Sequence, residues 1–192
     1  QLDVEDSVAI ADKPAARKLI QEAAESVSQA GADVVVRINQ PLRMAIPDLE
    51  ESISPRVKAI AVTKVDGPGH IRLLSEAIDE LESERGMDVG HTKLIAMVET
   101  AAGFLRIENI AKAHLRVVAM SLGSEDFATS IGTDPVAEVL TYPKQQGIIA
   151  ARAAGIIPLG LIGTVADYQD IDAMRETIRR SRRFGFQGAS CV

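Results

Sequence analysis

The chain has 192 residues, of which 46% are hydrophobic and 25% are charged, a composition that suits one globular domain with a sizeable core. Its net charge of −6 and aromatic content of only 3% argue against binding to nucleic acid or to an anionic membrane surface. The single cysteine, Cys191, excludes an internal disulfide, and no apolar run approaches the roughly 20 residues of a membrane helix, so we expect a cytoplasmic protein.

Seven short apolar runs predict the strands of a parallel sheet. Their lack of polar alternation is typical of strands that helices cover on both faces. The runs span residues 1–5, 33–38, 58–64, 93–98, 116–122, 156–162 and 188–192. The first and last runs resemble strands that have been cut, so we expect further residues on both sides of this sequence.

Amphipathic stretches between these runs predict the connecting helices. The first has Pro14 at its start and Gly31 at its end, the usual placement of these two residue types at helix termini. The predicted helices span residues 14–31, 70–86, 104–114, 143–155 and 170–185, and the segment DGPGH (66–70) is expected to be a loop.

This alternation of strand and helix predicts a TIM (β/α)₈ barrel, taken as one domain over residues 1–192. Seven strands would leave that barrel without its first βα unit and without a C-terminal segment. An open doubly wound sheet is the alternative, but the glycine-rich G-x-G-x-x-G turn of that fold is absent from the sequence.

Charged residues stand where the predicted strands end, and in a barrel these ends converge on the mouth that carries the chemistry. Glu99 and Asp126 follow neighbouring strands, and such oxygen ligands favour Mg²⁺, with Mn²⁺ as an alternative. Arg37 offers a planar fork for a substrate carboxylate, whereas Lys64 offers only a point charge. The other polar residues at strand ends are Asp3, Glu5, Asp6, Asn39, Thr100 and Glu125.

Several of these residues also have simpler interpretations. Asp126, just before the segment FATSIG, is equally interpretable as a first-turn helix charge. Cys191 is expected to be a buried structural thiol, and residues 175–186 are expected to form an exposed basic helix face, with contact to a phosphate-bearing cofactor tail as the alternative. The three histidines have no partner at ligand spacing and are expected to be solvated: His70, His91 and His114.

Seven segments follow one another along the chain: LDVEDSVAIADKPAAR, VVVRIN, AVTKV, IAMVETAAGF, SLGSEDFATSIG, YPKQQGIIAARAAG and FGFQGASCV. In content and order they resemble the citrate lyase beta-subunit family, which includes malyl-CoA and citramalyl-CoA lyases. The resemblance covers essentially the whole chain and implies a TIM barrel. It also implies a homo-oligomer, a trimer or hexamer, in which a C-terminal segment often reaches a neighbour's active site.

The resemblance also implies roles for particular residues. Glu99 and Asp126 would hold Mg²⁺, and Arg37 would grip the oxo-acid part of the substrate. Glu5 and Asp6 would lie near the waters of the metal. The backbone amides of Gly123, Ser124 and Glu125 would meet a substrate carboxylate. Lys64 is a further candidate, as a cation beside the substrate.

The implied activity is that of a Mg²⁺-dependent carbon–carbon lyase. It would cleave a citryl-, citramalyl- or malyl-type thioester, carried on CoA or on a carrier protein, into an acyl thioester and a 2-oxo acid. Two alternatives stay open, a metal-dependent aldolase that uses free pyruvate without CoA and a non-catalytic subunit that binds an oxo acid.

The chain departs from the family pattern in the segment LGLIGTVADY, where relatives often read close to AIDGVYTDF. Ile162 thus replaces an aspartate, which suggests a divergent branch of the family.

Overall fold

Six strands form one parallel sheet in the computed structural model of the chain, which describes residues 1–163 and 169–190. Their spatial order follows the sequence, from β1 to β6. Their bounds are β1 Leu2–Asp3, β2 Val34–Ile38, β3 Val57–Val62, β4 Lys93–Val98, β5 Val117–Leu122 and β6 Ile157–Leu159. A single parallel bridge between Leu159 and Gly188 extends the sheet beyond β6.

The consecutive strand order identifies the architecture. A doubly wound sheet reverses its strand order at a switch point, whereas a barrel adds each new strand on the same side of the preceding one. All five strand pairs are parallel and none departs from chain order, so the predicted α/β class with a parallel sheet is confirmed. Within the described residues the sheet is open, with β1 at one edge and the bridge at Gly188 at the other.

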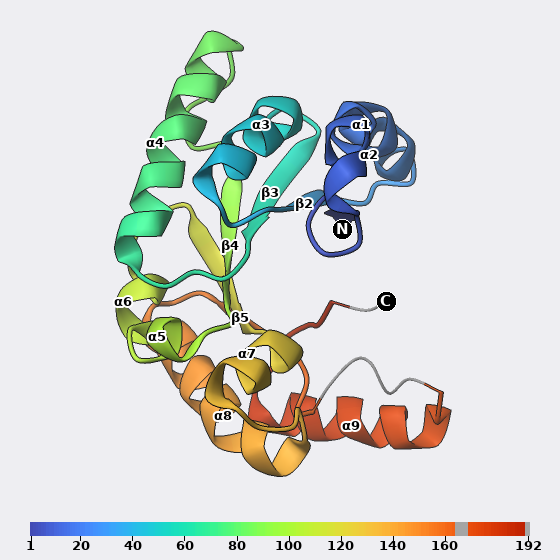
Figure 1. Cartoon of the computed structure of the whole chain (residues 1–192), viewed down its shortest axis with the longest axis vertical. Helices are drawn as coiled ribbons and strands as arrows, with labels where there is room; N and C mark the ends of the chain where they lie inside the picture. The colour runs from blue at the N-terminus through green and yellow to red at the C-terminus, as the bar shows by residue number, and fades with distance from the viewer. Residues whose placement is uncertain (164–168, 191–192) are drawn as a thin grey trace.

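Helices lie outside the sheet, with α3 and α4 beside its first half and α7 and α8 beside its second half (Figure 1). Their bounds are α1 Lys13–Lys18, α2 Ile20–Ser28, α3 Leu42–Ser52, α4 Pro68–Glu84, α5 Ala101–Phe104, α6 Ile107–Ala111, α7 Ser124–Ile131, α8 Ala137–Ala153 and α9 Ile171–Phe184, with a short 3₁₀ turn, η1, at Ile10–Asp12. In the part of the chain that the structure describes, no helix is both long and apolar enough to cross a bilayer.

The predicted strands are present but shorter than expected, for local reasons. The side chain of Asp3 accepts a hydrogen bond from the Glu5 backbone N–H at 2.9 Å, a turn that ends β1 before Glu5. Gly160 ends β6, because its φ of +142° is a conformation that glycine adopts far more readily than other residues. The last predicted strand is reduced to the bridge at Gly188, and the expectation for Cys191 lies outside the described residues.

Helix prediction was wrong at several places. α3 was not predicted, yet the helix forms with Pro47 inside it and buries its apolar face, including Leu49. α8 begins at Ala137 and continues through Pro143, and α7 was also missed. The segment predicted as the loop DGPGH contains the start of α4, because Pro68 occupies the first helical turn.

The core lies between the sheet and the helices that cover it. Val36 and Ile60 of the sheet pack with Ile20 of α2, Leu74 of α4 and Ile110 of α6 in one continuous cluster of buried side chains. Burial alternates along β2 and β4, because the second face of these strands looks toward the cavity described below. This packing fixes the positions of the strand ends.

The three histidines, which were expected to be solvated, are partly buried. His70 lies in α4 with its Nδ1 atom buried, and burial lowers the pKa of this imidazole. The Nε2 atom of His91 is also buried, and neither nitrogen has a hydrogen-bond partner within the described residues. His114 accepts a hydrogen bond from the backbone N–H of Arg116 at 3.2 Å on Nδ1.

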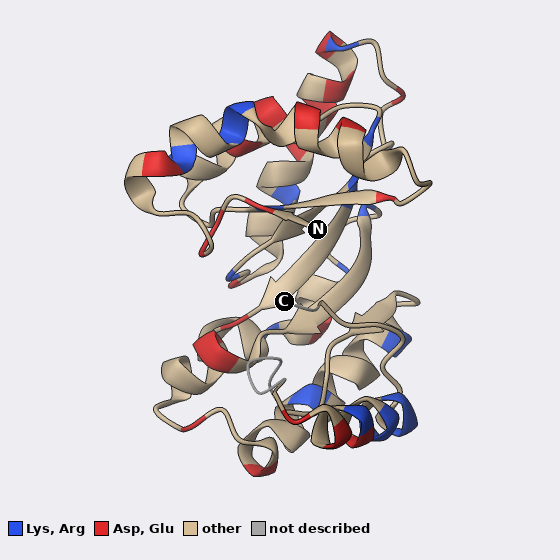
Figure 2. Cartoon of the chain, turned by 90° about the vertical axis from the view of Figure 1, so that its right-hand side faces the viewer, with Lys and Arg blue, Asp and Glu red and all other residues tan. Residues whose placement is uncertain are grey.

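The basic face predicted for residues 175–186 is confirmed as exposed. The blue segments that mark basic residues recur along α9 in Figure 2, and all of them are arginines. Arg175 pairs with Asp172 at 3.2 Å and Arg183 pairs with Glu176 at 2.9 Å, all with exposed side chains. These pairs lie within one helix and indicate a solvated surface.

A buried ion-pair network occupies the amino-terminal ends of β4 and β5. The guanidinium of Arg116, just before β5, contacts Glu82 and Asp79 of α4 and donates to the Thr92 carbonyl at 2.7 Å. Glu82 is fully buried and also accepts from the backbone N–H groups of Gly90 at 2.7 Å and Thr92 at 2.6 Å. This network secures α4 to the sheet at the end opposite the strand ends that carry the predicted site.

Candidate metal and substrate site

A cavity of about 660 Å³ lies at the carboxyl ends of the strands. Parallel strands in register bring their carboxyl ends to one side, which is where ligands bind in α/β folds. Its lining includes eight of the charged or small residues discussed here: Asp3, Asp6, Arg37, Glu99, Gly123, Ser124, Glu125 and Asp126. The structure therefore brings most of the predicted site residues to one place.

Glu99 follows the last residue of β4 and is only 5% exposed. Its Oε2 atom accepts a hydrogen bond from the Lys64 backbone N–H at 2.7 Å. Burial, as the largest cause, raises the pKa of Glu99 to about 7, although the Lys64 N–H and ammonium favour the charged form and the nearby carboxylates of Asp126 and Glu5 oppose it. Glu99 is a buried acid whose ionised form lacks sufficient positive charge nearby.

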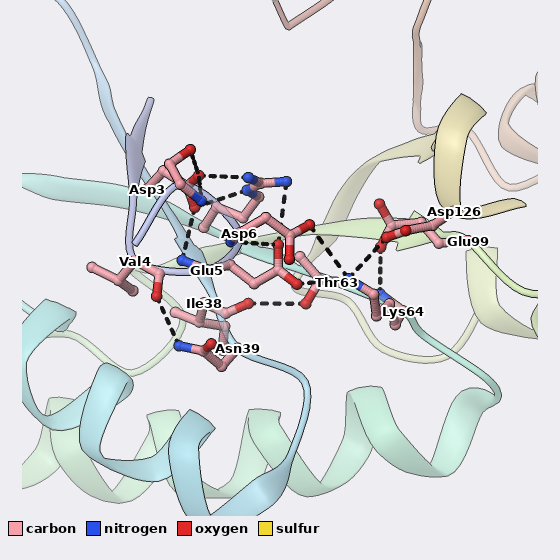
Figure 3. A network of polar contacts seen from close by, with 12 residues as sticks. Asp3, Val4, Glu5, Asp6, Ile38, Asn39, Thr63, Lys64, Glu99 and Asp126 are labelled. Atoms are coloured by element: carbon pink, nitrogen blue, oxygen red, sulfur yellow. Dashed lines mark hydrogen bonds and ion pairs between the residues drawn. The ribbon is translucent and has the colours of Figure 1, made fainter. Parts of the chain in front are cut away.

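Asp126 lies in the first turn of α7, so its interpretation as a first-turn helix charge is confirmed. Its side chain nevertheless reaches the cavity, where Oδ2 contacts the Lys64 ammonium at 2.9 Å. In Figure 3 Asp126 and Glu99 lie together on one side of Lys64, and Lys64 bonds to both acids through different atoms. The two interpretations of Asp126 are compatible.

Lys64 links the acids that arrive from different strands. Its ammonium nitrogen lies 2.6 Å from Oε1 of Glu5 and 3.6 Å from Oδ2 of Asp6, in addition to its contact with Asp126. These contacts raise the pKa of Lys64 against the effect of its burial. Among the described non-glycine residues it alone has a positive φ, at 50°, and such strain often accompanies functional positions.

Arg37, in β2, has its planar fork occupied by an acid of the same chain. Its Nε and one terminal nitrogen contact the two carboxylate oxygens of Asp3 at 2.9 and 2.5 Å, and its other terminal nitrogen lies 3.3 Å from Glu5. Burial alone would raise the pKa of Asp3, but hydrogen bonds from Arg37 and Ser7 lower it to about 2. Asp3 therefore orients Arg37, a role that the strand-end pattern did not assign.

The remaining predicted residues differ in their access to the cavity. Glu5 is buried, which raises its pKa, and its Oε2 accepts from the Asp6 backbone N–H at 3.0 Å, whereas the side chain of Asp6 is 62% exposed at the rim. Thr100 caps α5 by accepting from the Gly103 N–H at 3.0 Å. Asn39 is buried and donates to the Val4 carbonyl at 2.9 Å, so it serves the fold rather than the cavity.

Ile162, at the position where relatives often carry aspartate, does not line the cavity. It is buried, and its backbone N–H donates to the hydroxyl of Ser181 in α9 at 2.8 Å. The neighbouring residues Leu161 and Gly163 line the cavity instead. The hydrogen bond to Ser181 comes from the backbone and does not depend on the side chain at this position.

Lys144 in α8 is a cavity residue that the sequence interpretation missed. A signal was present, because it shares the buried helix face of Leu140, Ile148 and Ala151, and a lysine on an apolar face is unusual. Burial lowers the pKa of Lys144 to about 8.

The acids fit a hard divalent cation. Within residues 1–163 and 169–190 no group of three or more His, Cys, Asp or Glu side chains forms a complete metal site. Mg²⁺ commonly takes one or two protein carboxylates and fills its other positions with water and substrate, so Glu99 and Asp126 are the candidate pair of ligands here. A cation there would also favour the ionised form of Glu99, whose pKa burial has raised.

Gly123 is required at the end of β5 by the close approach of Glu99. Its φ of −67° is accessible to any residue, but a Cβ atom would lie 2.6 Å from Oε1 and 2.7 Å from Cγ of Glu99. We expect Gly123→Ala to displace the Glu99 carboxylate and weaken Mg²⁺ binding at least about 10-fold. Isothermal titration with MgCl₂ measures this, and Gly69→Ala, where a Cβ meets nothing within 4 Å, is the matched control. Unchanged affinity in Gly123→Ala would contradict the role of Glu99.

A family model described as HpcH/HpaI aldolase/citrate lyase matches residues 1–192. Among curated proteins, the chain is 32% identical over 196 residues to the citrate lyase subunit beta of Leuconostoc mesenteroides subsp. cremoris, covering 99% of this chain and 63% of that protein. It is 31% identical over 210 residues to the L-malyl-CoA/beta-methylmalyl-CoA lyase of Rhodobacter capsulatus, covering 97% of this chain and 65% of that protein. The chain thus spans just under two thirds of both relatives.

A solved structure is also similar. The citrate lyase beta subunit from M. tuberculosis, complexed with oxaloacetate and magnesium, superposes with a TM-score of 0.74 at 25% sequence identity, covering all of this chain and 79% of that one. This chain therefore shares its fold with a protein whose structure contains oxaloacetate and magnesium.

Proposed function

The chain belongs to the HpcH/HpaI aldolase/citrate lyase family, and from this premise we propose that it forms the catalytic part of a Mg²⁺-dependent carbon–carbon lyase. The reaction would be retro-Claisen cleavage of a 3-hydroxy acyl thioester of the citryl-, citramalyl- or malyl-CoA type. The products would be an acyl thioester and a 2-oxo acid. The observation that carries the proposal is the convergence of Glu99 and Asp126 in one cavity with Arg37.

Glu99 and Asp126 would hold the metal. When bound, Mg²⁺ (or Mn²⁺) supplies Lewis-acid polarisation of the substrate oxygen that becomes the oxo group. Glu99 suits this role because its buried carboxylate stands beside like charges, so its charged form gains most from a cation. Asp126 contributes a second carboxylate from the adjoining strand end.

The neighbouring side chains would bind and orient the substrate. Arg37, held in one orientation by Asp3, would direct its charge toward the oxo-acid carboxylate. Lys64, whose ammonium contacts Glu5 and Asp126, would add a second positive charge behind these acids. Asp6 would accept hydrogen bonds from water in the cavity, and the buried Glu5 would hold Lys64 in place. The backbone N–H groups of Ser124 and Glu125, at the start of α7, would meet a substrate carboxylate, whereas that of Gly123 donates to the Val98 carbonyl at 3.0 Å.

The relatives support the class of substrate. One is an L-malyl-CoA/beta-methylmalyl-CoA lyase, and the similar solved structure contains oxaloacetate and magnesium. The first relative supports a CoA thioester as the substrate, and the second supports a 2-oxo acid as a product.

Product analysis of the purified protein tests the proposal. Citryl-CoA, malyl-CoA and citramalyl-CoA are supplied separately with Mg²⁺, and both acyl-CoA and 2-oxo acid are quantified. We expect cleavage of at least one thioester to release acyl-CoA and 2-oxo acid in equal amounts. We expect this activity to be lost in excess EDTA. Pyruvate release from free hydroxy acids at comparable rates would favour the aldolase, and oxaloacetate binding by calorimetry without any turnover would favour a binding subunit.

A further inference from the structure

Lys144 is a buried lysine in the wall of the cavity, only 2% exposed and without a role in the proposed reaction. Burying an ammonium group is costly unless its three N–H donors are satisfied. Its Nζ atom donates to the Ser124 hydroxyl at 2.6 Å, to the Gly163 carbonyl at 2.5 Å and to the Leu161 carbonyl. All three donors have acceptors, which accounts for its toleration in the interior.

These contacts form a closed set that joins three separate elements. The Ser124 hydroxyl accepts from Lys144 and itself donates to the Gly163 carbonyl at 2.8 Å. The side chain from α8 therefore ties the first residue of α7 to the loop that follows β6. If the Lys144 ammonium were removed, only the hydrogen bond from Ser124 to the Gly163 carbonyl would remain of the four described hydrogen bonds.

The element held by Lys144 carries part of the proposed metal site. Ser124 begins α7, and Asp126 lies two residues further in the same turn. On the other side of Ser124 is Gly123, against which the Glu99 side chain packs. Movement of this turn would change the separation of the Glu99 and Asp126 carboxylates and the direction of the backbone N–H groups over 123–125.

We infer that Lys144 is a positioning residue whose ammonium group fixes the first turn of α7 and thereby sets where Asp126 lies relative to Glu99. The inference rests on the proposed function for the meaning of Asp126. A merely structural lysine would be expected to stabilise the whole fold evenly. A positioning lysine acts on one turn, and its effect is greatest on the groups that this turn presents to the cavity.

Lys144→Met tests the inference, because methionine matches the four-atom apolar stem of lysine but lacks its ammonium donors. Hydrogen–deuterium exchange of peptides covering 123–131 is compared with that of the unaltered protein, without metal. We expect exchange in this segment to be at least about 10-fold faster, with smaller changes elsewhere. We also expect the Kd for Mg²⁺, measured by calorimetry, to rise about 10-fold.

Lys13 provides a matched control. It is also buried, and it donates to the Val4 carbonyl at 3.0 Å and the Glu5 carbonyl at 2.6 Å on the other side of the mouth. Lys13→Met should accelerate exchange around residues 4–8 and leave 123–131 unchanged. Ser124→Ala is the second variant, in case Lys144→Met does not fold, and it should accelerate exchange in 123–131 by a smaller factor.

Unchanged exchange over 123–131 in folded Lys144→Met and in Ser124→Ala would overturn the inference. So would faster exchange with an unaltered Kd for Mg²⁺. The exchange result requires neither metal nor substrate, so it is separable from the proposed function. If the unaltered protein cleaves no thioester but the turn loosens as expected, the lyase proposal fails while the positioning of α7 by Lys144 stands.

Discussion

Replacing Glu99 by glutamine is expected to weaken Mg²⁺ binding at least about 100-fold and to lower kcat/KM for thioester cleavage by three orders of magnitude or more. Glutamine preserves the shape of the side chain and an oxygen that can accept from the Lys64 backbone N–H. It removes the negative charge that a divalent cation requires. Calorimetric titration with MgCl₂ and a product assay measure the two effects.

The same substitution is expected to stabilise the metal-free protein at alkaline pH. The pKa of Glu99 rises from its ordinary value of 4.5 to about 7 in the folded chain, so the folded state holds this proton more tightly than the unfolded state. Stability is therefore lost as the pH rises from 4.5 through about 7, and the loss is about 3 kcal/mol. Glutamine does not ionise, so Glu99→Gln should unfold at higher urea than the unaltered protein at pH 8 in EDTA, and nearly alike at pH 5.

Glu108→Gln is the control for both effects, because Glu108 is an exposed acid on α6. It should change neither Mg²⁺ affinity nor the pH dependence of unfolding. Tight Mg²⁺ binding retained by Glu99→Gln would refute the metal assignment, whereas lower stability at both pH values would refute the account of its burial. The combination of lost activity with gained stability is typical of functional residues held in unfavourable surroundings.

Glu82→Gln is expected to destabilise the fold by about 3 kcal/mol at pH 7, because it leaves the Arg116 guanidinium buried beside a neutral side chain. Burial opposes the ionised form of Glu82, but hydrogen bonds from Arg116 and from the backbone of Thr92 and Gly90 lower its pKa to about 2. A lowered pKa contributes stability above the unfolded value of 4.5 that is lost as the pH falls through about 2. The difference between the two proteins should therefore shrink as the pH falls below 4.5.

Urea unfolding at pH 7 and pH 3 measures this effect. Glu84→Gln is the matched control, since Glu84 is exposed two residues further along α4 and should alter stability by less than about 0.5 kcal/mol. A Glu82→Gln protein as stable as the unaltered one at pH 7 would show that the network contributes nothing net. Mg²⁺ binding by the folded variant should be unchanged, because the network lies at the opposite end of the strands from Glu99.

The strand pattern and the charged strand ends were readable from the sequence for simple reasons. Continuous apolar runs require a sheet that is covered on both faces, and parallel strands bring their last residues to one side. Glu99 and Asp126 could be placed at a common mouth without knowing any contact. The helices α3 and α8 were harder, because Pro47 and Pro143 suggest boundaries locally, while the burial of Leu49 and Leu140 makes the helices form.

By itself the sequence determined the α/β class and the residue types at the strand ends, because these follow from periodicity and local chemistry, whereas the strand order was observed in the structure. Only the tertiary structure decided which charges meet, since ion pairing depends on distances across several elements. It placed Asp3 on the fork of Arg37 and Lys64 among three acids. The tertiary structure also brings the Lys144 ammonium against two segments that are distant in sequence, the loop after β6 and the first turn of α7.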